Sequence, residues 1–299
     1  MRRSLRAFPC LLLLLAGCAQ KTLPSPAARA PIAASVPRAE CFPADRLPAE
    51  LRVKSEEMLL KALDAEALFT LAGGLKPMSS IGTTFTFPVD QTGSGPNPLI
   101  EERRRMLSVW RCGDGIFADA RVFRAITDGK RSVGGEVFYR PALDATLARH
   151  AEFFAPLGLT RGAHPMEVLT AIEWSDRGPR WRGQGYLYGY PDYAVDFFVE
   201  AGESEARTGV FVPRDPVRVP TFGATPDRSN FVWTVPKGHQ ENDQDRAVTS
   251  RAARILAAYA ERRPRYIGQG KPGAFALLRD WYCGDGGLCS PENAGLDAR

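Results

Sequence analysis

Three acidic residues of one segment have the types and spacing that suit proton transfer or cation binding. Asp192, Asp196 and Glu200 recur every four residues, so a helix that begins after Pro191 would carry them on one face. Two carboxylates on one face can act as general acid and base, or they can ligate a cation. The same stripe also fits a solvated face, opposite Phe197, that arginines from elsewhere in the chain neutralise. The sequence favours this second interpretation.

A histidine with acidic neighbours forms a second candidate. Glu241, Asp243 and Asp245 follow His239 and precede the longest helical pattern in the chain. A histidine beside carboxylates can transfer protons or bind a metal. Acidic residues at the start of a helix also cap it and interact favourably with its dipole, which is the simpler interpretation. Together the two segments supply the catalytic candidates, which are Asp192, Asp196, His239 and Glu241.

Arginines alternate with aromatic residues between positions 177 and 190. The ligand-binding candidates of this segment are Arg180, Trp181, Arg182 and Tyr186. Aromatic rings and guanidinium groups can stack on sugar rings or hold an anionic glycan. Tyrosines at positions 186, 188 and 190 also alternate as the buried face of a strand would, and this is the simpler interpretation.

Two disulfides are expected. Of the six cysteines, Cys10 lies in the N-terminal signal described below and Cys18 is expected to carry lipid, which leaves Cys41, Cys112, Cys283 and Cys289. An even number of cysteines in an oxidising compartment indicates disulfides, and four cysteines permit three pairings. Glycines between Cys283 and Cys289 favour a local loop, so we expect this pair together with Cys41–Cys112. Zinc is not expected, because no two cysteines have the usual short spacing and the three histidines are scattered.

A six-residue motif occurs twice. Residues 110–115 read Trp-Arg-Cys-Gly-Asp-Gly, and residues 281–286 read Trp-Tyr-Cys-Gly-Asp-Gly. Each copy ends an expected helix, with a glycine suited to the left-handed conformation and a tryptophan that packs on the core. This favours a structural role, while the alternative would pair Cys112 with Cys283 in a redox or metal site.

The familiar catalytic motifs are missing from the sequence. It contains no Gly-x-Ser-x-Gly, no His-Glu-x-x-His, no phosphate-binding loop and no dinucleotide-binding glycine motif at a helix start. Nothing marks His150, and His164 precedes a proline at an expected helix start. We therefore expect no cofactor and no metal.

The pattern of apolar residues predicts an α+β fold. Helices are expected at 49–63, 65–72, 99–112, 143–154, 165–174, 191–201, 243–262 and 274–283. Strands are expected at 83–87, 116–123, 132–139, 185–190, 210–212, 217–219 and 231–235. An Asp128-Gly129 turn should join two of the strands as a hairpin. Because strands and helices do not alternate steadily, we expect a mainly antiparallel sheet with several packed helices, in a single domain over residues 49–299.

The N-terminus has the organisation of a secretory signal. Arginines at positions 2, 3 and 6 precede an apolar stretch that is about half the ~20 residues needed to cross a bilayer. Residues 15–18, Leu-Ala-Gly-Cys, resemble the lipobox of bacterial lipoproteins. The resemblance is limited to this signal region. It implies cleavage after residue 17, a diacylglycerol on the Cys18 thiol, and a fatty acid such as palmitate on the new amino group.

Residues 18–48, which include six prolines and many alanines, are expected to form a tether between the lipid and the domain. Ala19 is not the aspartate that retains lipoproteins in the inner membrane of enteric bacteria, and this favours the outer membrane. Loss of the signal removes three arginines from a chain of formal charge +5, so the mature chain is close to neutral. No segregated basic face is evident, and no nucleic-acid partner is expected.

These features predict a lipoprotein of the cell envelope that faces an oxidising space such as the periplasm. Its expected role is a binding or assembly component, with an envelope glycan or protein as partner. The alternative is an envelope hydrolase that uses a carboxylate or His/acid site. An enzyme would need its acids to converge in a cleft.

Overall fold

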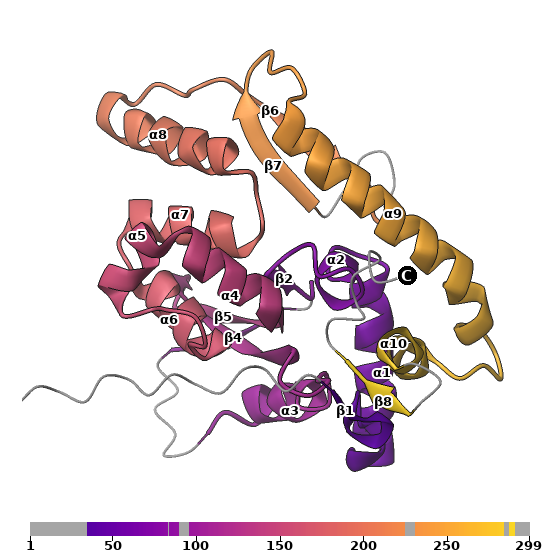
Figure 1. Cartoon of the computed structure of the whole chain (residues 1–299). Coiled ribbons are helices and arrows are strands. Elements are labelled where there is room, and N and C mark those ends of the chain that lie inside the picture. Colours follow the sequence, from indigo (N-terminus) through magenta and orange to yellow (C-terminus); the bar gives the residue numbers. More distant parts are fainter. Residues whose placement is uncertain (1–34, 83, 90–95, 225–230, 284–286, 291–299) are drawn as a thin grey trace, which may run out of the picture. The chain divides into compact units, whose positions relative to one another are not determined.

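The computed structural model describes residues 35–82, 84–89, 96–224, 231–283 and 287–290 (Figure 1). The predicted signal peptide, Cys18 and the tether up to residue 34 lie outside these residues. Within the described ranges, no helix combines the length and the apolar character needed to cross a bilayer.

The largest sheet is antiparallel and has four strands, β2 (Met78–Ser80), β3 (Phe85–Pro88), β4 (Ile116–Thr127) and β5 (Lys130–Tyr139). Strand β5 pairs with each of the other three. The predicted hairpin is β4–β5, and its turn residues Asp128 and Gly129 have φ values of 50° and 69°. A two-residue hairpin turn requires positive φ at both positions, which Asp-Gly tolerates.

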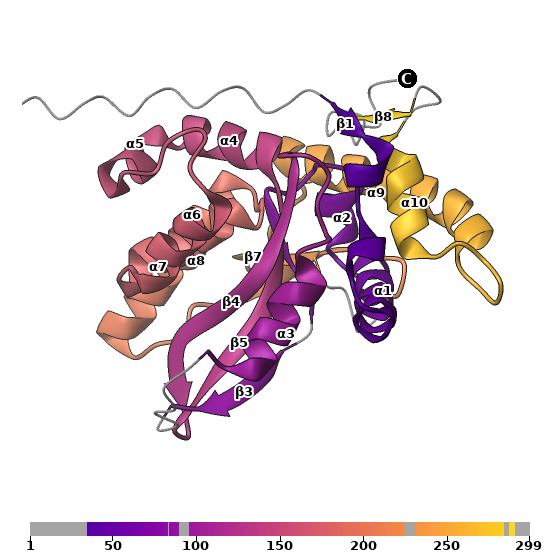
Figure 2. The ribbon, with the colours of Figure 1, turned by 90° about the horizontal axis from the view of Figure 1, so that it is seen from below.

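Helices cover both faces of this sheet (Figure 2). One group contains α1 (Ala49–Leu63), α2 (Leu68–Leu71) and α3 (Pro98–Leu107). The other contains α4 (Arg140–Arg149), α5 (Ala151–Phe154), α6 (Pro165–Trp174), α7 (Arg177–Leu187) and α8 (Asp192–Thr208). Neighbouring residues of β5 point to opposite faces, so Val137 and Tyr139 pack in the first core and Phe138 packs in the second.

The C-terminal part extends the first core. Strands β6 (Arg214–Val219) and β7 (Phe231–Pro236) form an antiparallel hairpin. Alternate residues of β7, which are Phe231, Trp233 and Val235, are buried in this core. Helices α9 (Asp243–Tyr266) and α10 (Ala274–Tyr282) complete it. The chain is therefore an α+β protein whose described strands all pair antiparallel.

The folded domain begins before Ala49, the boundary expected from sequence. Strand β1 (Val36–Pro37) pairs with β8 (Leu288–Cys289), and short 3₁₀ turns follow at Arg38–Glu40 and Ala44–Arg46. Cys41 and Phe42 are completely buried. Residues 36–48, which were assigned to the tether, thus belong to the domain, because a disulfide and a few isolated apolar side chains fix a segment that has no periodic pattern.

Local predictions failed where tertiary contacts override the pattern. No strand forms over 185–190, because residues 185–187 end helix α7 and residues 188–190 lie in the turn that follows it. A Cβ on Gly183 would lie 2.6 Å from Ile172, and one on Gly185 would lie 2.7 Å from Val195, so these glycines permit close helix packing.

Other expected elements end elsewhere. Helix 99–112 stops at Leu107, since Cys112 forms isolated β-bridges with Cys41 and Ile116. No strand forms over 210–212. The helix expected from residue 65 begins only at Leu68, and Asp64 ends α1 instead of capping α2.

Candidate functional site

A pocket lies between α4, α9 and the segment that links α7 to α8. Its volume is about 610 Å³. Helix α4 contributes Ala142, Ala145, Thr146 and Arg149 to the wall, and α9 contributes Gln244, Ala247, Val248 and Arg251. This side of the wall is completed by Tyr186 of α7, by Gly189, Tyr190 and Pro191 of the linking segment, and by Asp192 at the start of α8. His150, which directly follows α4, also lines the pocket. Apolar walls with a few converging polar groups are typical of ligand sites.

A histidine and an aspartate meet in this pocket. His150 Nε2 lies 3.4 Å from Asp192 Oδ1, and Arg149 Nη2 lies 2.9 Å from Asp192 Oδ2. The imidazole stacks on the Tyr186 ring, with 3.8 Å between ring centroids and 7° between the planes. The end of α4 and the start of α8 therefore hold the imidazole in one orientation beside a carboxylate.

The surroundings of His150 favour the neutral imidazole. Burial lowers the pKa of His150, and the nearby guanidinium groups of Arg149 and Arg182 act in the same direction. The carboxylates of Asp192 and Asp196 oppose this effect without reversing it. A neutral imidazole can accept a proton from a bound molecule, which a charged one cannot.

The acidic stripe predicted on α8 is only partly gathered at the pocket. Asp192 lines it, whereas Asp196 pairs with Arg182 and Glu200 is exposed further along the helix. Both Asp192 and Asp196 thus have arginine partners, as the solvated-face interpretation assumed. The cleft holds one of the three acids.

Of the four arginine and aromatic candidates, only Tyr186 reaches the pocket wall. Arg182 lies behind it and donates to the Tyr186 hydroxyl at 3.1 Å. Trp181 packs between α7 and α8, 5.3 Å from the Phe198 ring centroid, and Arg180 is not among the wall residues. The tyrosine belongs to a helix and not to the expected strand.

His239 lies in a separate cluster at the start of α9. Its Nε2 is 2.7 Å from Asp245 Oδ2 and 3.1 Å from the Tyr193 hydroxyl. Burial alone would raise the pKa of Asp245, but hydrogen bonds from Tyr193 and His239 bring it below its usual range. Asp245 and Asn242 also form a reciprocal capping box.

This arrangement accounts for the polar run that precedes the helix. The Asp245 side chain is almost entirely buried and is occupied by three donors. The side chain of Glu241 is exposed, and only its backbone carbonyl contacts Arg246. We interpret His239 and Asp245 as helix-capping residues.

A buried network of charged side chains was missed by the sequence analysis. Lys76 is completely buried, with Nζ 2.5 Å from Glu66 Oε2 and 4.3 Å from the Phe231 ring centroid. Arg121 lies 3.0 Å from Glu136 and 2.5 Å from Glu173. The signal available in the sequence was Glu136 itself, a charge within an expected buried strand.

Burial dominates the charge balance of this network. It lowers the pKa of Lys76 although Glu66 opposes the change. It raises the pKa of Glu136 to about 7, with Arg121 acting in the opposite direction. Among the described residues, no donor contacts Glu136 Oε2.

The cysteines are bonded in the two pairs expected from spacing, Cys41–Cys112 and Cys283–Cys289. Among the described residues, one group has the separation required for metal ligation. The sulfurs of Cys41, Cys283 and Cys289 lie within 4.8 Å of one another. Because all three are engaged in disulfides, they offer no thiolate to a metal in this state.

No protein-family model, curated protein or solved structure matches this chain.

Proposed function

We propose that the protein is a cell-envelope lipoprotein, anchored through lipid on Cys18, whose domain binds an anionic envelope glycan in the pocket between α4 and α9. The lipobox-like residues and the proline-rich segment after them support the anchor, and Ala19, in place of an aspartate, favours the outer membrane. The pocket supports the binding role, and the charged residues of its wall indicate an anionic ligand.

The pocket wall carries more positive than negative groups. Arg149 and Arg251 face it from opposite helices, and Asp192 is the single acid among the described residues of the wall. Arg149 is largely exposed, so it can exchange its contact with Asp192 for a ligand. Arg251 uses one nitrogen on the Gly73 carbonyl, at 3.1 Å, which fixes the rest of its guanidinium at the wall. Guanidinium groups bind carboxylates through paired hydrogen bonds.

Aromatic wall residues favour a sugar over a small inorganic anion. Tyr186 and Tyr190 both line the pocket. Their rings are restrained, since Tyr186 stacks on His150 and Tyr190 stacks on Phe231. Rigid aromatic surfaces beside donors to a carboxylate suit a saccharide that bears an acid group.

Calorimetric titration with N-acetylmuramic acid tests the proposal, and N-acetylglucosamine is the matched neutral sugar. We expect binding of the acid form and about tenfold weaker binding of the neutral form, the size of one charge-assisted contact. Arg251→Ala should weaken binding similarly, while Arg254→Ala, at an exposed position outside the wall, should not. Equal heats for both sugars, or no heat for either, would contradict the proposed ligand class.

A hydrolase is the second candidate, because His150 and Asp192 meet in the same pocket. A neutral imidazole oriented by a carboxylate can activate water as a general base. In that case His150→Gln would abolish turnover and leave ligand affinity largely unchanged.

A further inference from the structure

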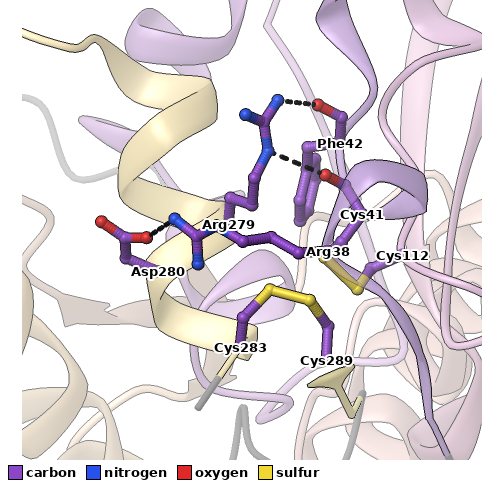
Figure 3. The surroundings of a disulfide bond; sticks show 8 residues. All are labelled: Arg38, Cys41, Phe42, Cys112, Arg279, Asp280, Cys283 and Cys289. Atoms are coloured by element: carbon purple, nitrogen blue, oxygen red, sulfur yellow. Dashed lines mark hydrogen bonds and ion pairs between the residues drawn. A yellow bond between two sulfur atoms is a disulfide. The ribbon is translucent and has the colours of Figure 1, made fainter. Parts of the chain in front are cut away.

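The two disulfides meet at one point of the fold. Cys41–Cys112 connects the N-terminal segment to the loop after α3, and Cys283–Cys289 connects the end of α10 to β8. Figure 3 shows the bridges next to each other. The Cys41 sulfur lies within 4.8 Å of both sulfurs of the other bridge, although it is bonded to neither.

Contacts other than the disulfides keep the two bridges together. Strand β1 pairs with β8, with Val36 opposite Cys289. The Arg38 amide donates to the Gly287 carbonyl at 3.0 Å. Arg279 of α10 donates to the carbonyls of Cys41 and Phe42, at 3.1 and 2.7 Å (Figure 3). Opening one bridge would therefore leave its sulfurs beside the other bridge.

We propose that the four cysteines form one thiol–disulfide exchange site, in which an external thiol reduces Cys283–Cys289 and the electrons pass on to Cys41–Cys112. The four cysteine residues differ slightly in exposure, in the direction that this order requires. Cys283 is 8% exposed, whereas Cys41, Cys112 and Cys289 are completely buried. Cys283–Cys289, the outer bridge, is therefore the more accessible of the two to an external thiol, and Cys41–Cys112 is the inner bridge.

The exchange consists of four successive attacks by a thiolate on a disulfide sulfur. The external thiolate attacks Cys283, displacing Cys289, and a second external thiol then displaces Cys283 to form a disulfide of the external thiol. The Cys283 thiolate attacks Cys41 and displaces Cys112. Finally, the Cys289 thiolate attacks Cys283, which restores the outer bridge and releases Cys41. Two external thiols are oxidised, and their two protons and two electrons end on Cys41 and Cys112.

The product of these exchange steps differs from the starting protein in one covalent bond, Cys41–Cys112, which is reduced. Cys41–Cys112 is the bond that joins residues 36–47 to the loop before β4. Once it is reduced, this segment is held by its pairing with β8 and by the contacts of Arg279. The external thiols thus lose electrons to a site that also fastens the N-terminal segment.

The first test removes one cysteine of the Cys283–Cys289 bridge and leaves the other as a free thiol. Cys289→Ser frees Cys283 beside Cys41, so exchange should form Cys41–Cys283 and move the free thiol to Cys112. The free thiol is labelled by alkylation, and peptide mapping locates the label. We expect roughly half of it at Cys112, because the two bridges have comparable surroundings. In the control, Cys41→Ser, label should stay on Cys112, since the route passes through Cys41. Label confined to Cys283 in the first variant, or spread over the outer pair in the control, would refute the route.

A second measurement uses the unmodified sequence, in case a variant fails to fold. The oxidised protein is treated with substoichiometric dithiothreitol, quenched with acid at successive times and mapped. The proposal expects a transient bond between Cys41 and Cys283, followed by thiols at Cys41 and Cys112 with the outer bridge intact. If only the two original bridges and their direct reduction products are found, the exchange does not occur.

Discussion

Arg121 of β4 and Glu136 of β5 form a buried ion pair across the hairpin, with Arg121 Nη1 3.0 Å from Glu136 Oε1. Both side chains are almost completely removed from solvent. The second guanidinium nitrogen contacts Glu173 of α6, so the pair ties the β4–β5 hairpin to the helices on one face. A buried pair of this kind is costly to desolvate and is weak evidence for stability, but breaking it leaves a charge without a partner.

Glu136→Gln should change how stability depends on pH. Burial raises the pKa of Glu136 to about 7, so the unfolded chain releases this proton at a lower pH than the folded chain. As pH rises from about 4.5 to about 7, ionisation therefore stabilises the unfolded state. The free energy of unfolding of the variant, relative to the original protein, should increase by up to about 3 kcal/mol over this range.

Urea unfolding at pH 5 and pH 8 measures this difference. A buried amide nitrogen that finds no acceptor would cost about 1–3 kcal/mol, and this cost does not vary with pH. Glu200→Gln, the same replacement at an exposed position, is the control. A constant offset between Glu136→Gln and the original protein would show that burial does not perturb this carboxyl.

The fold class and the main hairpin followed from local patterns. Alternation in 116–123 and 132–139, with Asp128-Gly129 between them, specifies an antiparallel pair through side-chain period and turn geometry alone. The start of α6 at Pro165 was also predicted, because proline suits the first turn of a helix. These signals need no knowledge of distant residues.

The predictions that failed depended on distant partners. Tyrosines 186 and 188 alternate like a strand, yet Gly183 and Gly185 let α7 pack closely against Ile172 and Val195. The sequence did not predict a role for His150, because its neighbours in the chain carry no motif. Its contact with Asp192 arises only where α4 meets α8. Because the pocket residues come from separate helices, they have no regular spacing along the sequence that could predict the pocket.

Cys18→Ser tests the anchor. The variant should not incorporate labelled palmitate and should keep its signal sequence, because lipid transfer to the thiol precedes cleavage in the pathway that the lipobox implies. Gel mobility and label, compared between the two forms expressed in a bacterial host, give the result. Cys10→Ser is the matched control and should be labelled and processed normally. Labelled Cys18→Ser would exclude lipid attachment at this residue.

Asp196→Asn tests whether the acids of α8 bind a cation. Asp196 pairs with Arg182 at a half-exposed position, so its loss should change stability by no more than about 1 kcal/mol. Melting curves with and without calcium should coincide for both forms. A calcium-dependent rise in the melting temperature of the original protein that is lost in Asp196→Asn would establish a cation site instead.

The last prediction concerns the protonation of His150, on which the hydrolase proposal depends. Burial keeps the pKa of His150 below its ordinary value, with Asp192 raising it and Arg149 lowering it. Asp192→Asn should therefore lower the pKa further, and Arg149→Ala should raise it. The histidine signals in an NMR titration give these values, and the spectrum of His150→Gln assigns the resonance. Because the folded state binds this proton less readily than the unfolded chain, the contribution of His150 to stability is lost as pH falls below about 6.5. If the pKa of His150 shifted in the same direction in Asp192→Asn and Arg149→Ala, the charges of Asp192 and Arg149 would not act on the imidazole as the structure indicates.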